Sequence, residues 1–224
     1  DRGNTGQLGA GDVQWMTAGS GILHQEMPQG NAQGQMHGFQ LWANLPSALK
    51  MTAPRYQDVQ GKDIPVVIDD DGTTMKIIIG SFWGKTGVVD GIAADPQYLD
   101  IFVPAGVKKT FKIDTYRRAF AYVFEGAAAF SDASAPEGVL LEKEVDGKEV
   151  NIRDLSGNRT LIRFGTGDNI TVQAGEVGVR FLLISGAPIQ EPVAWHGPIV
   201  MNTQAELQQA MDDLQNNTFI KPSH

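Results

Sequence analysis

Tyr98-Leu99-Asp100-Ile101-Phe102-Val103 is followed directly by Pro104-Ala105-Gly106, which indicates a β-strand that ends in a turn. Residues 107–113 then alternate apolar and polar side chains, the period of a strand with one buried face. Similar short runs, bounded by glycine or other turn residues, recur along the chain at residues 13–17, 39–45, 75–79, 120–124, 161–164 and 177–184. Strands repeated at this spacing predict an all-β barrel or sandwich.

The composition is that of a folded, acidic protein. The 224 residues weigh 24.2 kDa, about right for two domains of roughly 100 residues each. The net charge of −8 repels phosphate groups, so we expect no direct contact with nucleic acid or with an anionic membrane. The absence of cysteine excludes disulfides and thiolate metal sites. Without an apolar run long enough to span a membrane, or an initial signal peptide, the sequence predicts a cytoplasmic protein.

One helix is predicted near the end of the chain. Thr203 and Glu206 have the spacing of a capping box, in which each side chain bonds the backbone of the other residue. Apolar residues then recur at helical spacing, at Leu207, Ala210, Met211 and Leu214. We expect this apolar face to dock onto a sheet.

Metal chemistry in this chain is restricted to carboxylates and four histidines, His24, His37, His196 and His224. His24 and Glu26 are the best candidates, because on a strand their side chains would point to the same face. An imidazole beside a carboxylate supplies half of a site for iron, manganese, nickel or copper. The same pair also suits an ordinary surface or barrel wall, and a stable mononuclear site needs further ligands. His37 is either a third ligand or a loop residue.

A longer stretch, Gly11-Asp12-Val13-Gln14-Trp15-Met16-Thr17-Ala18-Gly19-Ser20-Gly21-Ile22-Leu23-His24-Gln25-Glu26-Met27-Pro28, resembles the second metal-binding motif of the pirin family in the cupin superfamily. The resemblance continues through residues 38–46 and 54–57, and near the end through residues 191–192 and 196–203. Residues 61–185 resemble the family only in the rhythm of their strands and turns.

The resemblance implies a bicupin, with two β-barrels of the double-stranded β-helix (jelly-roll) type and a C-terminal α-helix. On that basis we expect residues 1–60 to belong to a metal-binding barrel, residues 61–200 to form a metal-free barrel, and residues 201–224 to form the helix and tail. Pirins bind iron through a His-x-His motif followed by a histidine and a glutamate. His24 and Glu26 match these last two ligands residue by residue.

The sequence departs from the family pattern in lacking a His-x-His motif. We expect that motif upstream of Asp1, which leaves the metal site of this chain half complete, the chain alone inactive and the first barrel open. An open barrel exposes strand edges and apolar side chains. Upstream strands, or another chain through oligomerisation or strand exchange, are then expected to cover it.

The resemblance implies two classes of function. The first is a quercetin (flavonol) 2,3-dioxygenase, with Fe(II), or alternatively Mn, Ni, Cu or Zn, held in part by His24 and Glu26. Glu26 would also act as a general base toward the small aromatic substrate, beside a wall of Trp15, Met16, Phe39 and Trp42, which could equally be core residues. The second is a non-catalytic, iron-binding regulatory protein that acts through a partner protein. Residues 29–35 would form a lid over the site or a plain connecting loop.

Overall fold

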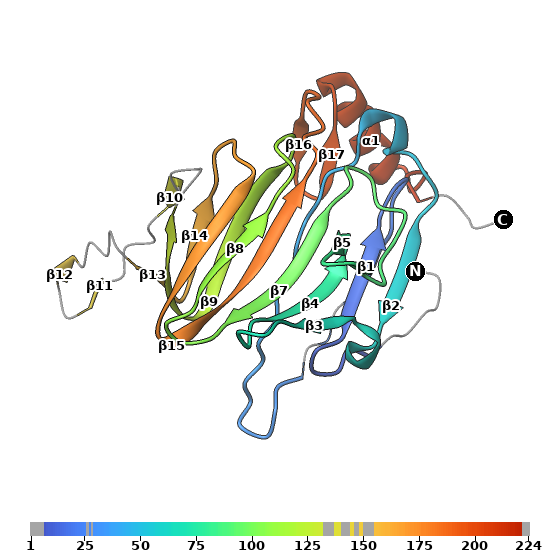
Figure 1. Ribbon diagram of the computed structural model, residues 1–224. Coiled ribbons are helices and arrows are strands. Elements are labelled where there is room, and N and C mark those ends of the chain that lie inside the picture. The colour runs from blue at the N-terminus through green and yellow to red at the C-terminus, as the bar shows by residue number, and fades with distance from the viewer. Residues whose placement is uncertain are drawn as a thin grey trace. The chain divides into compact units, whose positions relative to one another are not determined.

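The computed structural model describes residues 7–25, 27, 29–131, 137–139, 144–145, 148–149 and 155–220 (Figure 1). The chain divides into two compact units. Unit 1 comprises Asp1–Leu8, Gln14–Asp58 and Ile189–His224, and unit 2 comprises Gly9–Val13 and Val59–Pro188. The predicted domains 1–60, 61–200 and 201–224 stay a prediction. The structure adds that the end of the chain packs with residues 14–58.

Unit 2 is built on a nine-stranded antiparallel sheet, in which the strands lie in the order β10-β14-β9-β15-β7-β4-β3. In addition, β8 pairs with β15 and β13 pairs with β9. The strands of this sheet are β3 (Val66–Ile68), β4 (Thr74–Ile79), β7 (Gln97–Val103), β8 (Lys108–Lys112), β9 (Arg118–Ser131), β10 (Glu137–Val139), β13 (Ser156–Gly157), β14 (Thr160–Arg163) and β15 (Asn169–Gly186). Short two-stranded pairs add β5 (Ser81–Phe82) with β6 (Lys85–Thr86), and β11 (Glu144–Val145) with β12 (Lys148–Glu149).

The two longest strands, β9 and β15, bend at a shared corner. Residues 169–173 of β15 pair with β8, whereas residues 179–185 pair with β7, and the register shifts between the two halves. At the corner the φ angles of Gly126 and Gly178 are +69° and +82°. A Cβ on Gly126 would lie 2.1 Å from the carbonyl oxygen of Gly178, so a side chain there is sterically excluded.

This corner extends the prediction made from the sequence. Residues 120–124 and 177–184 were expected as separate short strands, each bounded by glycine or other turn residues. Instead both strands continue through their glycines, because the corner changes the strand direction without ending the pairing. The alternation predicted for residues 107–113 is confirmed, since Phe111 and Ile113 are buried and Lys108, Thr110 and Lys112 are exposed.

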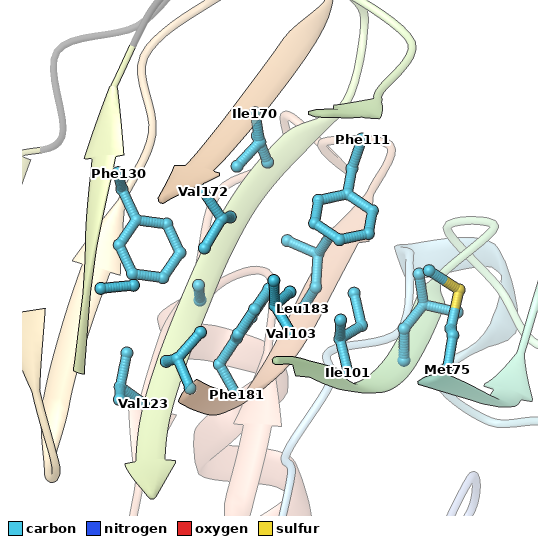
Figure 2. Close-up of a cluster of buried hydrophobic side chains, with 14 of the residues drawn as sticks. Met75, Ile101, Val103, Phe111, Val123, Phe130, Ile170, Val172, Phe181 and Leu183 are labelled. Carbon is cyan, nitrogen blue, oxygen red and sulfur yellow. The ribbon is translucent and has the colours of Figure 1, made fainter. Parts of the chain in front are cut away.

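Apolar side chains fill the interior of unit 2 (Figure 2). Phe181 lies at its centre, with ring centroids 6.1 Å from Phe111 and 5.4 Å from Phe130 in edge-to-face geometry. All three rings are nearly or fully buried. Edge-to-face pairs at these distances stabilise a core beyond the burial of their area. The interior of this unit is therefore a packed core.

One end of that core carries an ion-pair cluster. The ammonium group of Lys109 forms ion pairs with Asp69 and with Asp71, the latter at 2.7 Å. It also lies 5.2 Å from the centre of the Trp83 ring, which stacks on Phe111. The hydrogen bond from Lys109 lowers the pKa of Asp71 to about 2. Lys109 thus ties the turn between β3 and β4 to the hairpin of β5 and β6.

Unit 1 combines elements from both ends of the chain, namely β1 (Val13–Thr17), η1 (Ser47–Leu49), β2 (Arg55–Val59), β16 (Ala194–His196), β17 (Ile199–Met201) and α1 (Gln204–Gln215). β1 pairs with β2, and β16 pairs with β17. The predicted capping box is present, since the Thr203 hydroxyl accepts from the Glu206 N–H and the Glu206 carboxylate accepts from the Thr203 N–H. Leu207 and Ala210 of α1 pack on Ala194 and Ile199, as the predicted apolar face requires, while Leu214 is more exposed.

One predicted strand is absent. Residues 39–45, expected as a strand, have no regular secondary structure, and none of the described strands pairs with them. The polar segment 61–71 contains η2 (Gly61–Asp63) and strand β3. An apolar alternation forms a strand only where a neighbouring strand satisfies its backbone groups. Within the described part of the chain, no helix is long and apolar enough to cross a membrane.

The ion pair at Asp71 predicts a pH-dependent stability of unit 2. Because folding lowers the pKa of Asp71 to about 2 from about 3.9, its contribution is complete above about pH 4 and is lost as the pH falls toward 2. We expect Asp71→Asn to lower the free energy of unfolding at pH 7 by up to about 1 kcal/mol, the scale of a partly exposed ion pair. Urea denaturation at pH 7 and near pH 2 would measure the difference.

The matched control for that experiment is Asp70→Asn, because Asp70 is exposed and its carboxylate does not pair with Lys109. We expect this variant to match the wild-type chain at both pH values. An equal loss in the two variants would show that net charge, rather than the Lys109 ion pair, sets the pH dependence.

Candidate functional site

The predicted metal-binding stretch begins on β1 and leaves it through a turn at residues 18–21. The Ser20 N–H donates to the Thr52 carbonyl at 2.8 Å, and the Gly21 N–H donates to the Ala18 carbonyl at 2.9 Å. Ser20 is buried. The turn therefore fixes where the chain departs toward His24.

Gly21 meets the end of the chain at this turn. Its φ angle is +120°, and a Cβ there would lie 2.6 Å from the ring of Phe219. Phe219 also packs against the apolar cluster beneath α1. The direction of the chain just before His24 thus depends on the packing of a residue nearly 200 positions later.

His24 lies three residues beyond this turn, in a segment without regular secondary structure, and its side chain is exposed. It is not on a strand, so the alternation that would place it on the same face as Glu26 does not apply here. Glu26 lies outside the described residues. The pairing of His24 with Glu26 therefore stays a prediction.

The other histidines lie in separate settings. The ring of His37 makes an edge contact with Phe39, with centroids 5.1 Å apart, in the segment that follows the loop 29–35. His196 is exposed and pairs with Ile199 in the hairpin of β16 and β17. His224 lies outside the described residues. Among the side chains that the structure describes, no three His, Asp or Glu residues come together as a metal site.

The loop beside the motif is held by one side chain. The Asn31 side-chain oxygen accepts from the N–H groups of Gln33 and Gln35, at 3.0 and 2.9 Å. These bonds make residues 31–35 a closed turn. The proposed wall is mixed in exposure, since Trp15 and Met16 are half-buried whereas Trp42 is 71% exposed. Whether the loop acts as a lid and these residues as a wall stays a prediction.

Sequence reasoning missed a polar network that joins the two ends of unit 1. The Glu191 carboxylate accepts from the Ser47 N–H at 2.6 Å and from the Asn202 side chain at 2.8 Å. The hydrogen bond from Ser47 contributes most to lowering the pKa of Glu191, and the bond from Asn202 lowers this pKa further. Glu191 and Asn202 lie in the stretches that resemble the family. That resemblance was the one indication in the sequence that these two residues matter. Their partner at position 47 could not be read from the sequence.

Lys50 completes this network from a buried position. Lys50 is only 7% exposed, and its ammonium group donates a hydrogen bond to the Asn44 side-chain oxygen at 2.9 Å. Burial lowers the pKa of Lys50, while the nearby carboxylates of Glu191 and Glu206 oppose that shift. A buried ammonium needs such partners, because an unpaired charge in the interior is costly. Lys50 thus holds the loop at residues 44–50 close to the C-terminal segment.

A curled antiparallel sheet around an apolar core, followed by one C-terminal helix, defines an all-β protein of the cupin class. The family described as "Pirin C-terminal cupin domain" matches residues 98–220, and the family "Pirin" matches residues 1–43. These matches cover both ends of the chain, including the stretch that contains His24.

Individual relatives agree with the family matches. A pirin-like protein of Caulobacter vibrioides is 41% identical over 220 residues, which cover 97% of this chain and 71% of the relative. Pirin-1 of Arabidopsis thaliana is 38% identical, over 96% of this chain and 68% of the relative. The solved structure of a quercetin 2,3-dioxygenase from Acinetobacter baumannii is 30% identical with a TM-score of 0.72, covering 93% of this chain and 67% of that one. The chain belongs to the pirin family.

The contact at Gly21 predicts the effect of a small substitution. Gly21→Ala should destabilise unit 1, because the added Cβ meets the Phe219 ring in a backbone conformation that L-residues rarely adopt. The matched control is Gly34→Ala, where φ is +71° but no atom lies within 4 Å of the added Cβ. We expect a loss of more than about 1 kcal/mol beyond that of the control, measured by thermal denaturation. Equal losses would assign the effect to backbone strain alone.

Proposed function

We propose that this chain is part of a metal-dependent oxidoreductase of the quercetin 2,3-dioxygenase type, with His24 and Glu26 as two metal ligands. The observation that carries the proposal is the similarity to the Acinetobacter baumannii quercetin 2,3-dioxygenase, which extends over 93% of this chain. The match of residues 1–43 to the pirin family supports the assignment of His24 and Glu26, since both lie within it.

The setting of His24 supports this role. Its side chain is exposed, on a segment whose direction is set by the turn at residues 18–21. Imidazole and carboxylate together suit iron, and Fe(II) is the proposed metal. His24 alone does not hold a metal ion. In this proposal the remaining ligands are Glu26 and groups outside the described residues. The geometry of His24 alone supports no catalytic step.

A second candidate function has support from the surface of unit 1. Several large apolar side chains are strongly exposed there, among them Leu23, Met27, Met36, Trp42 and Trp195. Where such side chains form one continuous patch, they are typical of protein interaction sites. A regulatory role through a partner protein would use this surface and would not require turnover. The two candidates differ in whether substitution of the metal ligands removes the function.

The proposal predicts that metal content depends on His24 and Glu26. In the intact protein of which this chain is part, we expect His24→Ala and Glu26→Gln to lower the iron content per chain at least about tenfold relative to the unsubstituted protein, measured by elemental mass spectrometry after reconstitution with Fe(II). His196→Ala is the matched control, because His196 is also exposed but lies in the hairpin of β16 and β17. Unchanged iron content in the first two variants would exclude them as ligands.

Activity is tested on the same proteins. We expect the intact, iron-loaded protein to consume dioxygen in the presence of quercetin, and its His24→Ala variant to lose that activity while His196→Ala keeps it. If the iron-loaded protein leaves quercetin unchanged, the dioxygenase proposal fails and the interaction role of unit 1 is favoured.

A further inference from the structure

The turn at residues 18–21, which leads into the segment of His24, is held closely against Thr52. The Ser20 N–H donates to the Thr52 carbonyl oxygen at 2.8 Å. Gly19 has a φ angle of +52°, and a Cβ there would lie only 2.2 Å from the same oxygen. The backbone of the turn comes this close because position 19 has no side chain. The position of Thr52 therefore determines where the chain enters the segment that contains His24.

The short helix η1 connects Thr52 to Ser47. The Lys50 N–H donates to the Ser47 carbonyl oxygen at 3.3 Å. The Thr52 N–H donates to the Leu49 carbonyl oxygen at 3.1 Å, so successive turns overlap from residue 47 to residue 52. Hydrogen-bonded elements of this kind couple a displacement at one end to a displacement at the other. A shift of Ser47 is thus expected to move Thr52 and the turn before His24.

Glu191 supplies the acceptor at the start of η1. Pro46, the residue before this helix, has no side-chain group that caps it. Instead the Glu191 carboxylate accepts from the Ser47 N–H at 2.6 Å. A hydrogen bond to a charged acceptor is stronger than one between neutral groups. Glu191 therefore satisfies, from 144 positions away, one of the N–H groups that a helix leaves without an internal partner at its start.

A single oxygen of Glu191 accepts two hydrogen bonds. Its Oε2 accepts from the Ser47 N–H and, at 2.8 Å, from the side-chain amide of Asn202. The same amide donates to the Pro192 carbonyl oxygen at 3.0 Å. Asn202 thus holds the carboxylate in the orientation in which it meets Ser47.

We infer that Glu191 is a positioning residue for His24. Glu191 holds Ser47, η1 couples Ser47 to Thr52, and Thr52 holds the turn from which the chain enters the segment of His24. All of these residues belong to unit 1. The inference rests on the proposed function in one respect, since it takes His24 to be a metal ligand. Glu191 itself is not a ligand in this scheme, because it acts through the backbone of residues 47–52.

Hydrogen–deuterium exchange on this chain, followed residue by residue by NMR, tests the positioning without any metal. We expect Glu191→Ala to increase the exchange rate of the Ser20 amide about tenfold, the scale of one lost hydrogen bond to a charged group. Glu191→Gln should restore slow exchange, because its side-chain oxygen can accept the same two hydrogen bonds as Oε2.

The matched control is Asp212→Ala. Asp212 is an exposed carboxylate on α1 in the same unit, and it accepts a hydrogen bond from the side chain of Gln208. We expect this variant to leave the exchange rate of the Ser20 amide unchanged. Equal increases in Glu191→Ala and Asp212→Ala would assign the effect to the loss of a charge and would overturn the inference.

A second variant removes the same hydrogen bond from its other end. Ser47→Pro deletes the N–H that Glu191 accepts, at the first position of a helix, where proline is well tolerated. We expect this variant to increase the exchange of the Ser20 amide as Glu191→Ala does. Combining the two substitutions should add little to either alone, since both remove one interaction. Additive increases would show that Glu191 acts on the turn by another route and would overturn the inference.

The affinity for iron tests the consequence for the metal ligand. In the intact protein of which this chain is part, we expect Glu191→Ala to raise the dissociation constant for Fe(II) about tenfold, as when a group that orients a metal ligand is removed. Glu191→Gln should bind Fe(II) as tightly as the unsubstituted protein. Anaerobic titration with Fe(II) measures both values.

Two further results would overturn the inference. One is unchanged exchange of the Ser20 amide in Glu191→Ala. The other is faster exchange with unchanged affinity for Fe(II), because Glu191 would then be structural only. A failure of the proposed function is seen differently, as an iron content that His24→Ala leaves unchanged. In that case the exchange rates still decide whether Glu191 holds the turn before His24.

Discussion

The sheet of unit 2 depends on a close backbone approach between two strands, at a position where neither strand has a side chain. At Gly126 and Gly178 the strands β9 and β15 approach so closely that one Cβ would overlap the opposite carbonyl oxygen. The bend lets β15 pair with β8 in its first half and with β7 in its second. Phe130 and Phe181, from the two halves of these strands, then meet in the core. Without the corner, these two halves of the sheet could not face the same interior.

Unit 1 depends on polar contacts between distant parts of the chain. Glu191 bonds the backbone at Ser47, and Lys50 brings a positive charge close to Glu191 and Glu206. Phe219 fills the space that Gly21 leaves open. These contacts set the course of the segment that carries His24. The stability of this unit and the position of its candidate metal ligand are therefore linked.

The two units offer different surfaces to other molecules. The interior of unit 2 is filled by aromatic and aliphatic side chains. Unit 1 carries the exposed His24 and many exposed apolar side chains.

The sequence by itself determined the all-β class, the strands at residues 98–103 and 107–113, the capped helix and the family, because alternation, turn residues and capping act over a few neighbouring positions. The pairing of His24 with Glu26 rests on the sequence and stays a prediction. Only the tertiary structure decided that β9 and β15 continue through their glycines, that residues 39–45 form no strand, and that Lys50 is buried. Each of these depends on which distant segment lies alongside, as Glu191 and Ser47 do across 144 positions. Local sequence patterns do not indicate such partners, because the contact between distant segments forms only when the chain folds.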